Sequence, residues 1–124
     1  MTCKILIADD EPNILISLEY LMKREGYDVH VARDGQEALD VLRRERPRLV
    51  LLDVMMPKKT GFEVCQELRA DEALKDTIVL MLTAKGRDAD VAKGLALGAS
   101  AYMTKPFSTK ELVQGVRDLL GDAT

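Results

Sequence analysis

The chain has 124 residues, of which 47% are hydrophobic and 31% are charged, and its net charge is −3. This length can build one domain with a substantial core but is too short for two ordinary domains. The negative charge argues against a basic nucleic-acid-binding surface, and no apolar run approaches the roughly 20 residues that cross a bilayer. The amino-terminal segment becomes acidic within its first ten residues and lacks a small-residue cleavage site, so we expect no signal peptide and a cytoplasmic location.

The first predicted element is a strand at residues 4–8, KILIA, and an acidic triplet, Asp9, Asp10 and Glu11, follows it directly. Pro12 suits the first turn of a helix. Apolar residues at helical spacing predict a helix with one buried face. They are Ile14, Leu15, Leu18, Leu21 and Met22.

The second predicted strand is residues 28–32, DVHVA. It contains His30, which we interpret as an ordinary strand side chain, because a phosphate-relaying histidine is usually presented on an exposed helix. The segment from Asp34 to Glu37 is a variant of the capping box and predicts the start of the next helix.

The third predicted strand is residues 49–52, LVLL, and Asp53 comes directly after it. Four apolar residues in a row indicate a strand buried on both faces, so we expect Asp53 at the edge of the hydrophobic core. Residues 60–63 fit a capping box and predict a helix. Cys65 and Cys3 form no C-x-x-C pair, and we predict both as reduced packing residues.

The fourth predicted strand is residues 78–82, IVLML, with Thr83 at its end, and the fifth is residues 101–104, AYMT, followed by Lys105. Residues 108–111 fit another capping box. A last helix is predicted from its apolar spacing. Its apolar residues are Leu112, Val113, Val116, Leu119 and Leu120.

Five strands that alternate with five helices predict one α/β domain over residues 1–124, with its core at 4–120 and helices on both faces of a parallel sheet. In the flavodoxin-like, doubly wound order 2-1-3-4-5, the first and third strands flank the point where the strand order reverses. Because ligands bind there, outside the carboxyl ends of the strands, we expect Asp9, Asp10 and Asp53 to converge in one crevice.

Three carboxylates at close range repel one another, and a divalent cation with oxygen ligands relieves this repulsion. Mg²⁺ suits the site because it takes one or two carboxylates and keeps positions for water and phosphate; Ca²⁺ prefers a denser oxygen cage. Lys105 would add a cation and Thr83 a hydroxyl. These groups together predict a phosphoryl-transfer site in which Asp53 acts as the nucleophile and forms an aspartyl phosphate.

The sequence resembles the CheY-like receiver domains of bacterial two-component response regulators, from about residue 4 to residue 120. Four motifs carry the resemblance, and their order and spacing make chance agreement improbable. They are ILIADDE at 5–11, LLDVMMPKKTG at 51–61, LTA at 82–84 and GASAYMTKPF at 98–107.

The resemblance implies that Asp53 is the phosphoacceptor. It further implies that Asp10 binds Mg²⁺ directly, that Asp9 acts mainly through water, and that the backbone carbonyl of Met55 is a third protein ligand. Residues at the position of Met55 and at that of Lys85 tune the phosphoryl lifetime in the family. Met55 has no polar group to orient a water, so we predict slow hydrolysis.

The resemblance also implies a switch. Thr83 would close onto the phosphoryl group, Lys105 would pair with it, and the ring of Tyr102 would move inward. The bond between Lys105 and Pro106 is expected to be cis. The expected partners are a sensor histidine kinase or histidine phosphotransfer protein and a downstream protein on the face formed by the fourth helix, fifth strand and fifth helix.

We therefore expect a signalling phosphoacceptor that catalyses its own phosphorylation and slow dephosphorylation, and not an enzyme with a separate substrate. Residues 99–101 lack the acidic side chains of the symmetric dimers in many DNA-binding members, so we expect a monomer or weak dimer without direct nucleic-acid contact. An aspartate-nucleophile phosphatase of the haloacid-dehalogenase kind would need an acid at Met55. A flavodoxin is disfavoured because Asp9, Asp10 and Glu11 would repel its phosphate. The remaining alternative is an interaction module that is not phosphorylated.

Overall fold

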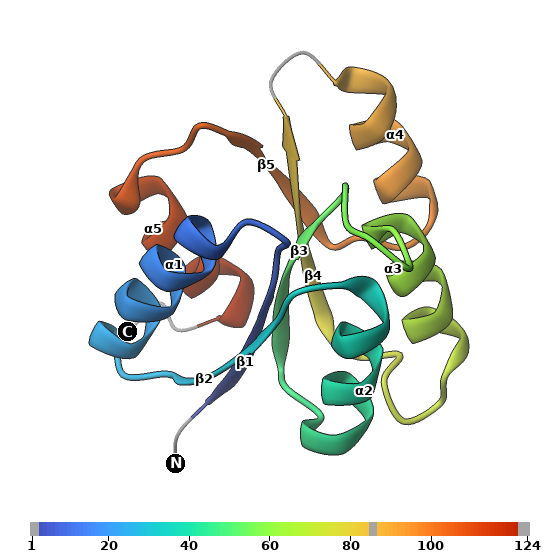
Figure 1. Cartoon of the computed structure of the whole chain (residues 1–124), viewed down its shortest axis with the longest axis horizontal. Helices are drawn as coiled ribbons and strands as arrows, with labels where there is room; N and C mark the ends of the chain where they lie inside the picture. Colours follow the sequence, from blue (N-terminus) through green and yellow to red (C-terminus); the bar gives the residue numbers. More distant parts are fainter. Residues whose placement is uncertain (1–2, 85–86, 122–124) are drawn as a thin grey trace.

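Strands and helices alternate along the whole chain in a computed structural model that describes residues 3–84 and 87–121 (Figure 1). The strands are β1 (Lys4–Ala8), β2 (Asp28–Ala32), β3 (Leu49–Asp53), β4 (Ile78–Ala84) and β5 (Ala101–Lys105). The helices are α1 (Pro12–Arg24), α2 (Gly35–Glu45), α3 (Gly61–Ala70), α4 (Asp88–Ala96) and α5 (Thr109–Leu120). In the described part of the chain, no helix has both the length and the apolar character needed to cross a membrane.

The five strands form one parallel sheet in the order β2-β1-β3-β4-β5, which confirms the predicted flavodoxin-like topology. The register brings the ends of β1 and β3 to one level, because Ala8 is paired with Leu52. On the other side of β3, Asp53 is paired with Leu82. The strand ends that carry polar residues therefore share one edge of the sheet, on both sides of the strand-order reversal.

Two layers of helices cover the sheet: α1 and α5 pack on one face, and α2, α3 and α4 pack on the other (Figure 1). Strand β3 lies in the middle, and alternate residues enter the two cores: Leu49 and Leu51 face one, while Val50 and Leu52 face the other. All four are fully buried. This explains why the strand is apolar at every position, since each face of a covered sheet needs its own core residues.

The helix starts follow the capping signals in the sequence. Thr60 forms a complete capping box with Glu63 before α3. Before α2, Asp34 accepts a hydrogen bond from the backbone N–H of Glu37, but the Glu37 carboxylate accepts from the N–H of Arg33, one residue earlier than the box requires. At α5, the Ser108 hydroxyl caps the first turn. These caps satisfy backbone donors that the first helical turn leaves free.

A single arginine of α3 ties three segments together at the end of the sheet opposite the acidic residues. The guanidinium of Arg69 donates hydrogen bonds to four oxygens of the two loops that lead into β4 and into β5. They belong to the carbonyls of Gly98 (2.9 Å), Lys75 (2.8 Å) and Thr77 (2.6 Å) and the hydroxyl of Ser100 (3.3 Å). Because a planar guanidinium carries five donors in a fixed arrangement, this position suits arginine specifically.

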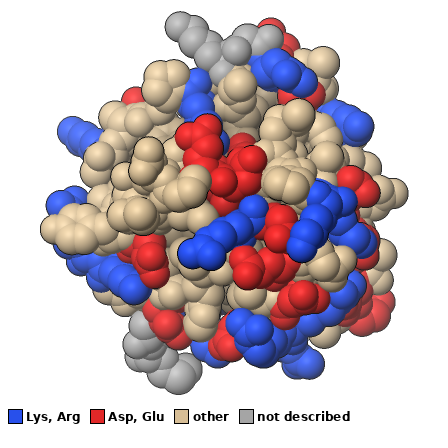
Figure 2. All heavy atoms as spheres, in the orientation of Figure 1, with Lys and Arg blue, Asp and Glu red and all other residues tan. Residues whose placement is uncertain are grey.

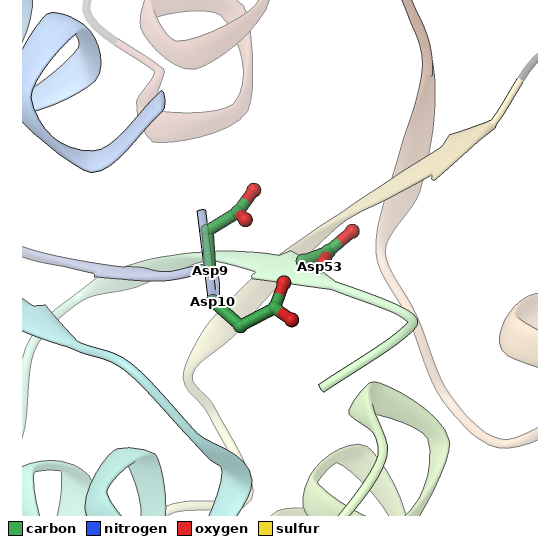
Figure 3. A group of neighbouring side chains, drawn as sticks. All are labelled: Asp9, Asp10 and Asp53. Carbon is green, nitrogen blue, oxygen red and sulfur yellow. The ribbon is translucent and has the colours of Figure 1, made fainter. Parts of the chain in front are cut away.

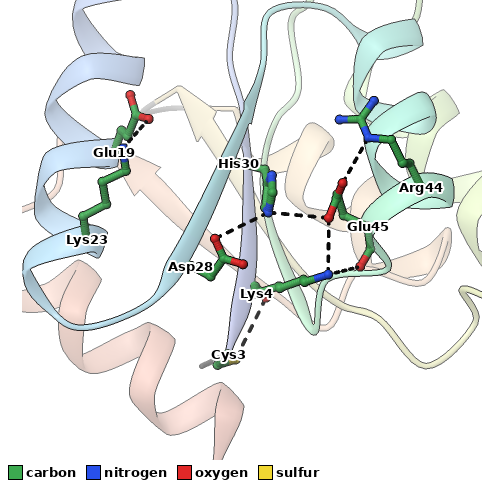
Figure 4. Close-up of polar contacts among 8 residues, drawn as sticks. All are labelled: Cys3, Lys4, Glu19, Lys23, Asp28, His30, Arg44 and Glu45. Atoms are coloured by element: carbon green, nitrogen blue, oxygen red, sulfur yellow. Dashed lines mark hydrogen bonds and ion pairs between the residues drawn. The ribbon is translucent and has the colours of Figure 1, made fainter. Parts of the chain in front are cut away.

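The edge strand β2 carries polar side chains toward the end of α2 (Figure 4). His30, half-buried in the strand as predicted, has its Nε2 atom 3.6 Å from Asp28 Oδ1 and 3.8 Å from Glu45 Oε1. Lys4 Nζ lies 3.2 Å from the same Glu45 oxygen. Hydrogen bonds from Arg44 and Lys4 lower the pKa of Glu45. Strand β2 thus presents charged groups near its amino end.

The two cysteines form no disulfide, as the sequence predicts. Cys65 is buried in α3, where its thiol lies 3.6 Å from the carbonyl oxygen of Leu97, and burial raises its pKa. Cys3 packs, partly buried, against the core between the sheet and the layer of α1 and α5. Both residues therefore serve packing.

Candidate functional site

Three carboxylates meet at the edge of the sheet where β1 and β3 end (Figure 3). Asp9 and Asp10 follow β1, Asp53 is the last residue of β3, and one oxygen from each lies within 4.8 Å of the others. Asp9 is fully buried and Asp53 nearly so, while Asp10 is exposed. Hard oxygen ligands at this spacing fit a small divalent cation such as Mg²⁺.

The turn between β1 and α1 fixes Asp9. Its backbone N–H donates to the carbonyl of Ala32 on β2 at 3.1 Å, which extends the pairing of β1 and β2 by one residue. Its carboxylate Oδ1 accepts from the N–H of Glu11 at 2.9 Å. These two hydrogen bonds fix the backbone of Asp9 and one oxygen of its carboxylate. The other oxygen, Oδ2, remains available for other partners.

Asp53 is held by the close passage of its own backbone against the start of α3. The N–H of Gly61 donates to the carbonyl of Val54 at 2.8 Å. A Cβ atom at position 61 would lie only 2.3 Å from the carbonyl oxygen of Asp53. Glycine is required here by the close approach, and the loop from β3 to α3 is pressed onto the residue that carries the acid.

Lys105 supplies the positive charge predicted at the end of β5. Its Nζ lies 2.9 Å from Asp9 Oδ2 and 3.2 Å from Asp53 Oδ1. Burial alone would lower the pKa of Lys105, but the hydrogen bonds and charges of the two aspartates outweigh it and raise the pKa. Lys105 is thus a stable cation between them, and its bond to Pro106 is cis.

The pKa of Asp53 is raised to about 6. Burial is the main cause and the charge of Asp9 adds to it, while Lys105 opposes both. Lys105 therefore does not offset the combined effect of burial and the charge of Asp9 on the pKa of Asp53. A divalent cation would favour the ionised form of Asp53, which is also the form that can act as a nucleophile.

Thr83 lies within β4, one residue after Leu82, the pairing partner of Asp53. It is 2% exposed, and its hydroxyl oxygen has no hydrogen-bond partner among residues 3–84 and 87–121. A buried hydroxyl without a partner typically costs about 1–3 kcal/mol. The hydroxyl is therefore available to a ligand at this strand edge.

The structure does not bring Tyr102 into the cluster. It lies on β5 beside Met81 of β4, and the residue is 47% exposed. Met55 follows β3 at the rim of the site and is 62% exposed. Lys85 lies outside the described residues.

A cleft of about 320 Å³ opens over the carboxylates. It is lined by Asp10, Glu11, Asp53, Val54, Met55, Leu82, Ala84, Arg87, Asp90 and Lys105. Sequence reasoning missed Arg87 and Asp90, whose side chains form an ion pair of 2.9 Å at the start of α4. No motif marks them, and only the path of the chain after β4 brings the start of α4 to the cleft.

Comparisons with known proteins agree with this geometry. The family model of the response regulator receiver domain matches residues 5–117. The chain is similar to the chemotaxis response regulator CheY4 of Vibrio cholerae, with 32% identity, a TM-score of 0.90, and coverage of 96% of this chain and 99% of that chain.

Two further similar structures come from sensor proteins. One is the signal receiver domain of a signal transduction histidine kinase from Syntrophus aciditrophicus, with 32% identity, a TM-score of 0.90, and coverage of 99% of this chain and 93% of that chain. The other is the receiver domain of a sensor histidine kinase from Pseudomonas aeruginosa PAO1, with a magnesium ion coordinated in its active site cleft. It shows 28% identity, a TM-score of 0.90, and coverage of 98% of this chain and 99% of that chain.

Proposed function

The chain belongs to the response regulator receiver domain family of two-component signalling, and from this we propose that it accepts a phosphoryl group on Asp53. The observation that carries the proposal is the meeting of Asp9, Asp10, Asp53 and Lys105 at one sheet edge. We further propose that residues 4–120 act as a single cytoplasmic receiver domain, as a monomer or weak dimer. Its partner would be a sensor histidine kinase or a histidine phosphotransfer protein.

In the proposed reaction, a carboxylate oxygen of Asp53 attacks the phosphorus of a phosphohistidine. The new O–P bond forms as the P–N bond breaks, and a donor already protonated on its other ring nitrogen leaves as neutral imidazole. Lys105, already 3.2 Å from Asp53, is placed to pair with the phosphoryl oxygens. Catalysis of this kind is mainly positioning and charge neutralisation.

Asp9, Asp10 and Asp53, with the backbone carbonyl of Met55, are the groups that would hold Mg²⁺. Three carboxylate oxygens within 4.8 Å of one another support this assignment. When bound, the ion would neutralise charge on the carboxylates and the phosphoryl oxygens. The similar receiver domain from Pseudomonas aeruginosa has magnesium in its active site cleft.

The switch would begin at Thr83, whose buried hydroxyl finds no partner in the described part of the chain and would gain one when it turns to the phosphoryl group. Movement of Thr83 would open space toward β5, into which the exposed ring of Tyr102 can turn. The face formed by α4, β5 and α5 would change and would bind the downstream protein. A phosphoryl group that stabilises one of two arrangements in this way acts by population shift.

An apolar groove of about 460 Å³ beside Lys105 suits the phosphodonor protein. Its lining comes from the first half of α1, the last residues of β4 and β5 and the segment that follows β5, and includes Ile14, Leu18 and Phe107. In Figure 2 uncharged surface predominates on the left, where Figure 1 places α1, whereas charged side chains crowd the lower right over α2 and α3. A kinase helix seated in this groove would bring its phosphohistidine to the open end beside Lys105.

Incubation with Mg²⁺ and acetyl phosphate, followed by intact mass measurement, tests the proposal. We expect one added phosphoryl group that is stable to acid and labile to base, and none in Asp53→Ala. Asp10→Asn should need much more Mg²⁺ for the same uptake. No uptake by the unmodified chain would favour the non-phosphorylated interaction module, and uptake that survives Asp53→Ala would reject Asp53 as the acceptor.

A further inference from the structure

Two charged residues of the cleft have no role in the chemistry described so far. Arg87 and Asp90, at the start of α4, line the same cleft as Asp53 and Met55. A guanidinium nitrogen of Arg87 lies 2.9 Å from Asp90 Oδ2, and their side chains are 52% and 15% exposed. The side chain of Asp90 is therefore mostly buried, while about half of the Arg87 side chain is open to solvent.

The charges of the cleft give Arg87 a special position. The described lining includes the carboxylates of Asp10, Glu11, Asp53 and Asp90, and its cations are Lys105 and Arg87. Lys105 is held between two aspartates. Arg87 is the cation of this lining that lies outside that arrangement. A phosphodonor, which is an anion, must enter a cleft with excess negative charge, and a cation at the mouth would favour its entry.

The contact that holds Arg87 is easily exchanged. An ion pair three residues apart at a helix start, with one partner half exposed, contributes little to stability. A guanidinium can form two parallel hydrogen bonds with a phosphoryl group, and such charge-assisted bonds are about twice as strong as neutral ones. Asp90 contacts the guanidinium through one nitrogen, so a phosphoryl group that accepts two parallel bonds can compete with it for Arg87, and lysine would reproduce only the charge.

We propose that Arg87 is a phosphodonor-binding residue: its guanidinium leaves Asp90 and pairs with the phosphoryl oxygens of the donor as they enter the cleft. Asp90 holds the guanidinium at the mouth when no donor is bound and competes with the donor for it. This inference rests on the proposed function, because it concerns the donor of the group that Asp53 accepts. It assigns to α4 a part in loading the site, in addition to its part in the output face.

The test compares initial rates of phosphorylation over a range of acetyl phosphate concentrations at saturating Mg²⁺. Arg87→Gln should raise the half-saturating donor concentration about tenfold, which is the effect of one lost interaction of about 1.4 kcal/mol. The maximal rate and the Kd for Mg²⁺ should change less than about twofold, because Arg87 touches neither Asp53 nor the metal ligands in this scheme. Arg87→Lys should recover part of the loss, and Asp90→Asn should lower the half-saturating concentration.

The matched control is Lys93→Gln, which removes the same charge from the same helix. Lys93 lies over the ring of Phe62, 4.6 Å from its centroid, and is not part of the cleft lining. It should behave like the unmodified chain. A titration with beryllium fluoride and Mg²⁺, followed by tyrosine fluorescence, should show weaker binding for Arg87→Gln and unchanged binding for Lys93→Gln.

The outcomes separate this inference from the proposed function. If the unmodified chain takes up no phosphoryl group, both are overturned. If it does, and the donor curves of Arg87→Gln and the unmodified chain coincide, only the role of Arg87 is overturned. Equal losses for Arg87→Gln and Lys93→Gln would also overturn that role, because they would show a general effect of helix charge.

Discussion

Lys105 reaches from β5 past the intervening strand β4 to within 3.2 Å of Asp53 on β3. The same ammonium group lies 2.9 Å from Asp9, which follows β1. The Lys105 side chain therefore connects the end of β5 with the ends of β3 and β1, and neither of these two strands pairs with β5 in the sheet. Its charge keeps two buried carboxylates at close range.

Removal of this charge should destabilise the metal-free protein. In Lys105→Met the two aspartates face each other without a cation, and we expect a loss of about 3 kcal/mol in the free energy of unfolding. The loss should be smaller with Mg²⁺, which would take over the neutralisation. Urea unfolding with EDTA and with Mg²⁺ measures both values, with the exposed Lys110→Met as the control. An equal loss in both conditions would contradict this account.

The raised pKa of Asp53 predicts that its charge destabilises the metal-free fold. Since the folded pKa is about 6 and the ordinary value is 3.8, the folded chain binds a proton between these values that the unfolded chain does not. The cost is absent below about pH 4, grows with pH, and is complete above about pH 6, where it reaches at most roughly 3 kcal/mol.

Asp53→Asn should therefore be more stable than the unmodified chain at about pH 8, and the difference should vanish near pH 4. Urea unfolding with EDTA over this pH range measures the difference. Asp76→Asn, which removes an exposed carboxylate outside the crevice, serves as the control. A gain in stability that is the same at every pH would show that the charge of Asp53 is not its cause.

Met55 should prolong the life of the phosphorylated form. It stands 62% exposed at the rim of the cleft, and its thioether cannot orient a water molecule for attack on the phosphoryl group. Met55→Asn supplies an amide for this purpose and should speed dephosphorylation on the order of tenfold, less than a full general base would. Mass measurement after removal of the donor gives the rate, and Met55→Leu is the control. An unchanged or slower asparagine variant would reject the idea.

Arg69 should be among the residues most important for stability outside the two cores. Its four acceptors include carbonyls of the loop before β4 and of the loop before β5, and lysine cannot reach all of them from one nitrogen. We expect Arg69→Lys to lower the free energy of unfolding by about 2–3 kcal/mol. Arg117→Lys, which alters a single contact with Glu25, should change the free energy of unfolding by less than about 1 kcal/mol. Similar effects of the two substitutions would show that the four hydrogen bonds of Arg69 do not have this importance.

The topology and the meeting of the acids were predictable because apolar runs and carboxylates follow each other at the spacing of strand–helix units. The residues at which the strands end were less predictable. Strand β3 includes Asp53 and β4 continues to Ala84, each beyond its apolar run. Backbone pairing such as that between Asp53 and Leu82 does not depend on hydrophobicity, so the pattern of apolar residues ends before the strand does.

Other features depend on geometry that no local pattern records. The outward position of Tyr102 is one choice among side-chain rotamers, and β-strand residues adopt several of them. The approach of Arg87 to the cleft follows from the path of the chain between β4 and α4. The acceptors of Arg69 lie in two loops that only the folded chain brings together.

The charged groups near the start of β2 have a consequence for behaviour at high concentration. An edge strand exposes unpaired backbone groups that can recruit a second chain and begin aggregation. Asp28 and His30 stand on this strand close to Glu45, so another strand added at this edge would have to lie against polar and charged side chains. The edge is thereby protected against fibril growth, and substitution of these polar residues by valine or isoleucine would remove the protection.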